Sequence, residues 1–88
     1  MRSALKVRII NQKGLHARPS HALVTCALGF PCEIRVRSRA QEVNGKSILE
    51  LMTLAAACGH ELEFIAEGEG AEEAVRALAA LVNAGFDE

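Results

Sequence analysis

Four short segments of the chain alternate between apolar and polar residues, which is the pattern of strands that bury one face. They cover residues 4–10, 32–37, 41–43 and 61–67. In the last of them, Leu62, Phe64 and Ala66 alternate with glutamates. Because each strand has one apolar and one polar face, the pattern predicts a sheet that helices cover on one side and that faces water on the other.

Three further segments repeat apolar residues at helical spacing, and each is followed by a glycine, which favours a helix end. The predicted helices cover about residues 17–28, 48–57 and 71–84, with Gly29, Gly59 and Gly85 after them. The residues expected on the buried stripes are Leu23, Val24, Ala27 and Leu28 in the first helix, and Ala74, Val75, Leu78, Leu81 and Val82 in the last. The element order is therefore β-α-β-β-α-β-α, which predicts the α+β class.

Length and charge narrow the class of protein. The 88 residues are enough for one modest core, so residues 1–88 are predicted to form a single domain. The formal net charge of −1 argues against a nucleic-acid-binding protein. Since no run of 18 apolar residues and no secretory signal is present, we expect a cytoplasmic protein without membrane insertion. Cys26, Cys32 and Cys58 lack C-x-x-C spacing and are expected to be reduced and buried.

The stretch Gly14-Leu15-His16-Ala17-Arg18-Pro19 stands at the predicted start of the first helix. His16 falls at the N-cap, and Pro19 is well tolerated in the first turn because its missing N–H needs no partner there. The unpaired backbone amides of Ala17 and Arg18 and the helix dipole favour a bound anion, most naturally a phosphate. The Arg18 guanidinium suits phosphate oxygens. The residues therefore indicate a histidine that carries a phosphoryl group, with an ordinary helix-start histidine as the alternative.

A second motif, Asn44-Gly45-Lys46-Ser47-Ile48, precedes the second predicted helix. Ser47 with Glu50 three residues later predicts a capping box, in which the serine accepts from the N3 amide and the glutamate reaches back. A regulatory phosphoserine is the alternative, and the cap is favoured. A nucleotide-binding loop at Gly45-Lys46-Ser47 is rejected, because the loop is not glycine-rich and lacks the first glycine of that motif.

Two other features concern binding. Ile48, Leu49 and Met52, with Leu15, are apolar residues near these motifs, and from the sequence they fit a buried core or a protein-docking surface equally well. His16, His21 and Cys26 are spaced five residues apart, which does not keep three ligands on one helix face. We therefore predict no metal site and no cofactor.

The two motifs together resemble the histidine-containing phosphocarrier protein (HPr) family of the phosphoenolpyruvate-dependent phosphotransferase system, and the match in length and element order covers nearly the whole chain. The resemblance implies an open-faced β-sandwich, a four-stranded antiparallel sheet covered on one face by three helices. It also implies that enzyme I, which takes its phosphoryl group from phosphoenolpyruvate, phosphorylates His16 on Nδ1, and that a sugar-specific enzyme IIA receives the group. The chain would then be a monomeric carrier and not an enzyme.

The resemblance assigns further roles. Arg18 matches the residue that stabilises the phosphate, and Ser47 matches the serine that a dedicated HPr serine kinase/phosphorylase modifies in some bacteria. Partner-docking positions match Leu15, Ala17, Ile48, Leu49 and Met52. The chain departs from the family at His21, where a small residue is usual and where a histidine would either alter docking or add a pH-sensitive charge near the site. It also departs at Glu50, where glycine is frequent and where a carboxylate would repel a phosphoserine.

Two other functions stay open. One is the same phosphoryl chemistry in a regulatory branch, either a nitrogen-related relay or kinase control through Ser47, without direct sugar transport. The other is an interaction module in which His16 is silent and only the docking surface matters.

Overall fold

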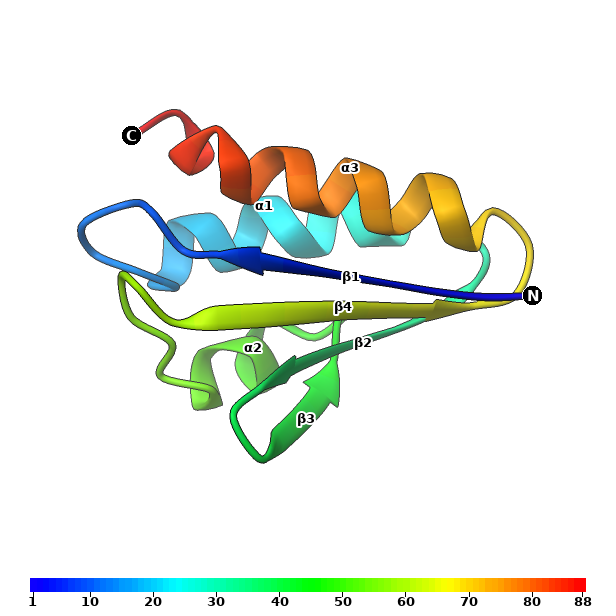
Figure 1. Ribbon diagram of the computed structural model, residues 1–88, viewed down its shortest axis with the longest axis horizontal. Coiled ribbons are helices and arrows are strands. Elements are labelled where there is room, and N and C mark those ends of the chain that lie inside the picture. Colours follow the sequence, from blue (N-terminus) through cyan, green and yellow to red (C-terminus); the bar gives the residue numbers. More distant parts are fainter.

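The computed structural model describes all 88 residues, and Figure 1 shows strands and helices in the predicted order. The elements are β1 (Arg2–Arg8), α1 (Ala17–Leu28), β2 (Glu33–Ser38), β3 (Gln41–Asn44), α2 (Ile48–Thr53), β4 (Glu61–Glu67), α3 (Ala71–Asn83) and the 3₁₀ helix η1 (Gly85–Asp87). The strands form one antiparallel sheet in the order β1-β4-β2-β3. Helices α1 and α3 lie side by side along this sheet (Figure 1). The predicted α+β class and the helix-covered antiparallel sheet are confirmed.

The central strand β4 shows how the alternating pattern produces the two faces of the sheet. Leu62, Phe64 and Ala66 are completely buried in the core under the helices. On the other face, Glu63 lies opposite Lys6 of β1 and opposite Arg37 of β2, and its carboxylate pairs with the Arg37 guanidinium. These three charged side chains therefore meet as opposite charges on the solvent face, which supports strand pairing.

Helix α1 has the predicted bounds, but its buried stripe differs at both ends. Pro19 and Ser20 of the first turn are buried, while Leu28 is 64% exposed, so the prediction that Leu28 lies in the core is wrong. At about 100° per residue, Leu28 is rotated well away from Ala27, the last buried residue of the stripe. Gly29 follows as the C-cap in a right-handed conformation, so the helix end does not use its conformational freedom.

Helix α2 ends four residues before the predicted position, at Thr53. Ala55 has a positive φ of 48°, and Ala56 and Ala57 then lie against Gly14 in the loop that leads into α1. The Ala56 carbonyl accepts a hydrogen bond from Leu15 N–H at 2.9 Å. Because this contact fixes residues 55–57 in an irregular path, the helical spacing of the sequence there is overridden by tertiary packing.

Helix α3 also differs slightly from the expectation, since it ends at Asn83 and Leu81 is only partly buried at its edge. Gly85 has a positive φ of 63°, in agreement with the predicted C′ role, and starts η1. None of the helices has the length and hydrophobicity needed to span a membrane.

The three cysteines are unpaired but differ in exposure. Cys32 is buried and Cys26 is half-buried, and burial raises the pKa of the Cys26 thiol. Cys58 lies on the exposed segment before β4, so the expectation that all three thiols are buried is wrong for this residue.

Candidate functional site

His16 is the N-cap residue of α1. Its backbone is extended, with φ −83° and ψ −171°, and its carbonyl accepts from Ser20 N–H at 3.1 Å, which is the first hydrogen bond of the helix. The side chain makes no capping bond to the helix amides, and 35% of it is exposed. The imidazole is therefore held at the helix start by its backbone, and its ring nitrogens are not engaged by the helix amides.

The loop before His16 is held rigidly. Buried Asn11 donates from Nδ2 to the Gly14 carbonyl at 2.8 Å, and Gly14 N–H donates to the Asn11 carbonyl at 3.1 Å. Gly14 has φ +66°, and a Cβ on it would lie 2.5 Å from the Ala56 carbonyl oxygen. Only glycine combines this left-handed conformation with so close an approach of two backbones. The position of His16 is thus set by a tight turn packed against residues 56–57.

Two backbone amides at the start of α1 have no partner. Ala17 N–H and Arg18 N–H make no hydrogen bond within the chain, and Pro19 has no N–H to offer. The helix dipole adds partial positive charge at the same point. The Arg18 guanidinium also makes no ion pair with any carboxylate. The first turn therefore presents hydrogen-bond donors without a partner in the chain beside the imidazole, as phosphate binding at a helix N-terminus requires.

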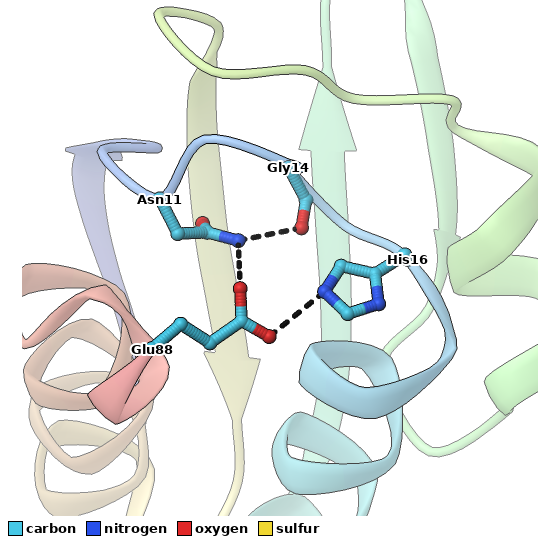
Figure 2. Close-up of polar contacts among 4 residues, drawn as sticks. All are labelled: Asn11, Gly14, His16 and Glu88. Carbon is cyan, nitrogen blue, oxygen red and sulfur yellow. Dashed lines mark hydrogen bonds and ion pairs between the residues drawn. The ribbon is translucent and has the colours of Figure 1, made fainter.

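Glu88 also contacts His16, and no pattern in the sequence predicted this contact. Its Oε2 lies 2.8 Å from His16 Nε2, and its Oε1 accepts from Asn11 Nδ2 at 3.1 Å (Figure 2). Partial desolvation acts to raise the pKa of the Glu88 carboxyl. However, hydrogen bonds from Asn11 and His16, with the charges of His16 and Arg18, hold that pKa below its ordinary value. Glu88 is therefore a carboxylate at neutral pH, in direct contact with the imidazole.

The site opens into a cleft of about 860 Å³ between the loop after β1, the first turns of α1 and the segment after α3. His16, Arg18 and His21 contribute polar side chains to it, and Ile10 and Phe86 contribute apolar ones. His21, singled out in the sequence as a departure from the family, thus lies in the same cleft as His16. The imidazole, which is 35% exposed, is therefore accessible from solvent through this cleft.

The residues expected to dock partners fall into two groups. Leu49 is 79% exposed and Met52 is 43% exposed on α2, while Ile48 is partly buried against the core. Leu15 is only 5% exposed and packs within the core, so the structure corrects the expectation that its side chain supplies docking surface. The reason is the Gly14 turn, which directs the loop inward against residues 56–57.

Ser47 caps α2, but the capping box is not reciprocal. Ser47 Oγ accepts from Glu50 N–H at 3.2 Å, as predicted. The Glu50 carboxylate, however, accepts from Asn44 N–H at 2.9 Å, because Ser47 N–H already donates to the Asn44 carbonyl. The predicted bond from Ser47 N–H back to Glu50 is therefore absent, and Glu50 instead closes the turn before the helix.

Comparison with known proteins gives a consistent result. Residues 4–84 match the family described as PTS HPr component phosphorylation site. The chain is 46% identical over 86 residues to phosphocarrier protein HPr of Pseudomonas aeruginosa, covering 97% of this chain and 96% of that protein. It is 40% identical over 83 residues to phosphocarrier protein NPr of Escherichia coli, covering 93% and 92%. The crystal structure of HPr-C-His from Thermoanaerobacter tengcongensis superimposes with a TM-score of 0.93 at 37% identity, covering 98% of this chain and 97% of that one.

Proposed function

Because this chain belongs to the HPr family of phosphocarriers of the phosphotransferase system, we propose that His16 is the residue that carries its phosphoryl group. The chain is a carrier and not itself a catalyst. One observation supports His16 above all others. Its imidazole stands at a helix N-terminus next to the two unpaired amides of Ala17 and Arg18.

The contact with Glu88 supports Nδ1 as the nitrogen that reacts. A carboxylate only accepts hydrogen bonds, so the nitrogen it faces, Nε2, carries the proton in the neutral ring. The lone pair is then on Nδ1, on the far side of the ring from the carboxylate (Figure 2). Nδ1 attacks phosphorus, and the N–P bond forms as the bond between phosphorus and the donor breaks. The backbone amides of Ala17 and Arg18 and the Arg18 guanidinium receive the phosphoryl oxygens.

Membership of the family implies partners of the phosphotransferase system such as enzyme I and enzyme IIA. In the proposed relay, phospho-enzyme I supplies the phosphoryl group and an enzyme IIA domain removes it, in the cytoplasm. The exposed side chains of Leu49 and Met52, with the partly exposed Ile48 beside them and His21 in the cleft, form the proposed docking surface. Apolar residues next to a charged reacting group are suited to brief protein contacts.

A regulatory branch is the second candidate, and the similarity to phosphocarrier protein NPr favours it. The identity of 40% to that protein is lower than the 46% to phosphocarrier protein HPr of Pseudomonas aeruginosa, so sugar transport stays first. The sugar-transport and regulatory branches are distinguished by comparing enzyme I of the sugar system with its nitrogen-related counterpart as phosphoryl donors. The donor that phosphorylates this chain with the higher kcat/KM identifies the branch.

Control through phosphorylation of Ser47 would meet two obstacles in this structure. The serine oxygen is engaged as the cap of α2, and the Glu50 carboxylate lies in the turn that precedes the helix. A phosphate on Ser47 would be repelled by that carboxylate. Glu50→Gly should therefore make Ser47 a faster substrate of an HPr serine kinase. Equal rates for the variant and the unchanged protein would contradict this.

The test of the carrier is transfer of labelled phosphoryl from phosphoenolpyruvate through enzyme I. We expect acid-labile, base-stable label on the unchanged protein and none on His16→Ala. His60→Ala is the matched control, because it removes an imidazole that lies outside the cleft of His16 and should keep the label. Label on His16→Ala, or its absence from the unchanged protein with both kinds of enzyme I, would refute the proposal.

A further inference from the structure

The carboxylate of Glu88 links the imidazole of His16 to the side chain of Asn11. One oxygen contacts His16 Nε2 at 2.8 Å, and the other accepts from Asn11 Nδ2 at 3.1 Å. The same Asn11 amide group donates to the Gly14 carbonyl at 2.8 Å. Asn11 is 6% exposed, so a buried side chain in the loop holds the carboxylate that faces the imidazole (Figure 2).

We propose that Glu88 is a positioning residue for His16, which fixes the proton on Nε2 and stabilises the cationic ring that forms when Nδ1 takes up the phosphoryl group. This inference rests on the proposed function of His16. It adds a residue that is 72 positions away in the sequence and that belongs to the segment after α3.

The first part of this role concerns the neutral ring. An imidazole that hydrogen-bonds a carboxylate through one nitrogen must carry its proton there and leave the other nitrogen with a free lone pair. A carboxylate that orients a histidine in this way selects its reactive tautomer in several kinds of active site. Here Asn11 fixes the second oxygen, so the carboxylate cannot turn away without losing a hydrogen bond. Glu88 therefore keeps Nδ1 unprotonated and aimed away from itself.

The second part concerns the phosphorylated ring. When the Nδ1 lone pair forms the N–P bond, the donor keeps the electron pair of the bond that breaks. The proton stays on Nε2, so the ring becomes a cation. The adjacent Glu88 carboxylate offsets this charge. When an acceptor attacks phosphorus, the N–P bond breaks, its electron pair returns to Nδ1, and the neutral ring with its Nε2 proton is restored.

Solvent exposure of His16 and Glu88 limits how much the carboxylate can change the rate of phosphoryl transfer. The side chains of His16 and Glu88 are 35% and 23% exposed, so water partly screens their interaction. A single charge-assisted hydrogen bond at such a site supports a change of about tenfold in rate and not the thousandfold changes of fully enclosed sites. Removing the Glu88 carboxylate should lower the rate constant of phosphoryl transfer and leave the KM for this protein unaltered, because Glu88 orients the ring and docks no partner.

The tautomer is tested on the unphosphorylated protein, so the result does not depend on the carrier function. Ring ¹⁵N chemical shifts of His16, measured by NMR at a pH where the ring is neutral, report which nitrogen holds the proton. In Glu88→Ala the Nδ1 resonance should move toward the protonated position. Glu88→Gln should keep the shifts of the unchanged protein, because its amide oxygen also accepts from Nε2. Asp87→Asn, which removes a neighbouring charge without contact to His16, should change nothing.

The charge effect is tested by single-turnover transfer from phospho-enzyme I. Glu88→Ala and Glu88→Gln should both be slower by about tenfold, since both lack the carboxylate, and Asp87→Asn should equal the unchanged protein. If Glu88→Ala keeps the original ring shifts, the positioning role is refuted. If its rate constant matches that of Asp87→Asn, the stabilisation of the cation is refuted. If only the KM rises, Glu88 acts in docking and the proposal fails.

Discussion

Replacing Gly14 by alanine should disturb the site through the backbone. Gly14 has φ +66°, and its new Cβ would lie 2.5 Å from the Ala56 carbonyl oxygen and 2.8 Å from Ala57 Cα. Both atoms belong to the backbone, so no side chain can move aside to relieve the clash. The loop must shift, and it would carry away the Leu15 N–H that donates to Ala56 at 2.9 Å.

The expected loss follows from two contributions. Placing a residue with a Cβ in the left-handed region costs about 1–2 kcal/mol. Overpacking against immobile atoms costs about 1–3 kcal/mol more, so Gly14→Ala should lower the free energy of unfolding by roughly 2–5 kcal/mol. For a chain of 88 residues the total is about 4–13 kcal/mol, so the loss is a large fraction of the stability.

Gly59→Ala is the matched control for this prediction. Gly59 also has a positive φ, +92°, but a Cβ there would meet nothing within 4 Å, so its loss should stay near 1–2 kcal/mol. Urea unfolding followed by circular dichroism at 222 nm measures both variants, since the chain has no Trp or Tyr for fluorescence. Equal losses for the two variants would refute the steric part of the reasoning.

Three other predictions concern the cap, the docking surface and pH. Ser47→Ala should cost about 1 kcal/mol of stability in the same urea assay, because Glu50 N–H loses its partner. Leu49→Asp should raise the KM for phospho-enzyme I roughly five- to tenfold, whereas the same change at Leu28, which is 64% exposed but lies outside the proposed surface, should not. The pKa of Glu88 is lowered in the folded state, so its carboxylate stabilises the fold above its ordinary pKa and that gain disappears as the pH falls. The stability difference between the unchanged protein and Glu88→Gln should therefore be present at pH 7, begin to shrink near the ordinary glutamate pKa of about 4.3, and vanish only below the lowered pKa of the folded state.

Several parts of the site could be predicted because they depend on near neighbours in the sequence. The N-cap position of His16 follows from the apolar spacing after it and from Pro19 in the first turn. The cap at Ser47 follows in the same way from the helix that begins at Ile48. The local pattern already predicted an anion site beside His16, and the family resemblance then implied which phosphoryl donor and acceptor use it.

The errors fall where distant segments meet. The sequence allowed either a docking role or a core position for Leu15. The structure buries its side chain, because the Gly14 turn packs against Ala56 and Ala57. The same contact ends α2 at Thr53, although apolar spacing continued beyond it. Helical spacing of apolar residues shows only that a helix is possible. Here the Ala56 carbonyl accepts a hydrogen bond from Leu15 N–H, and this tertiary contact replaces the continuation of α2.

The sequence by itself determined the order of the elements, the apolar and charged faces of the sheet and the positions of both helix caps. These features depend on contacts within a few residues and on the periods of helix and strand. Only the tertiary structure decided the strand order, the burial of Leu15 and the contact between Glu88 and His16. That last contact joins residues 72 positions apart, and it exists because α3 returns along the sheet to the loop after β1 and ends in a turn at Gly85. No local pattern predicts where the segment after α3 lies, since its position is set by the packing of the elements before it.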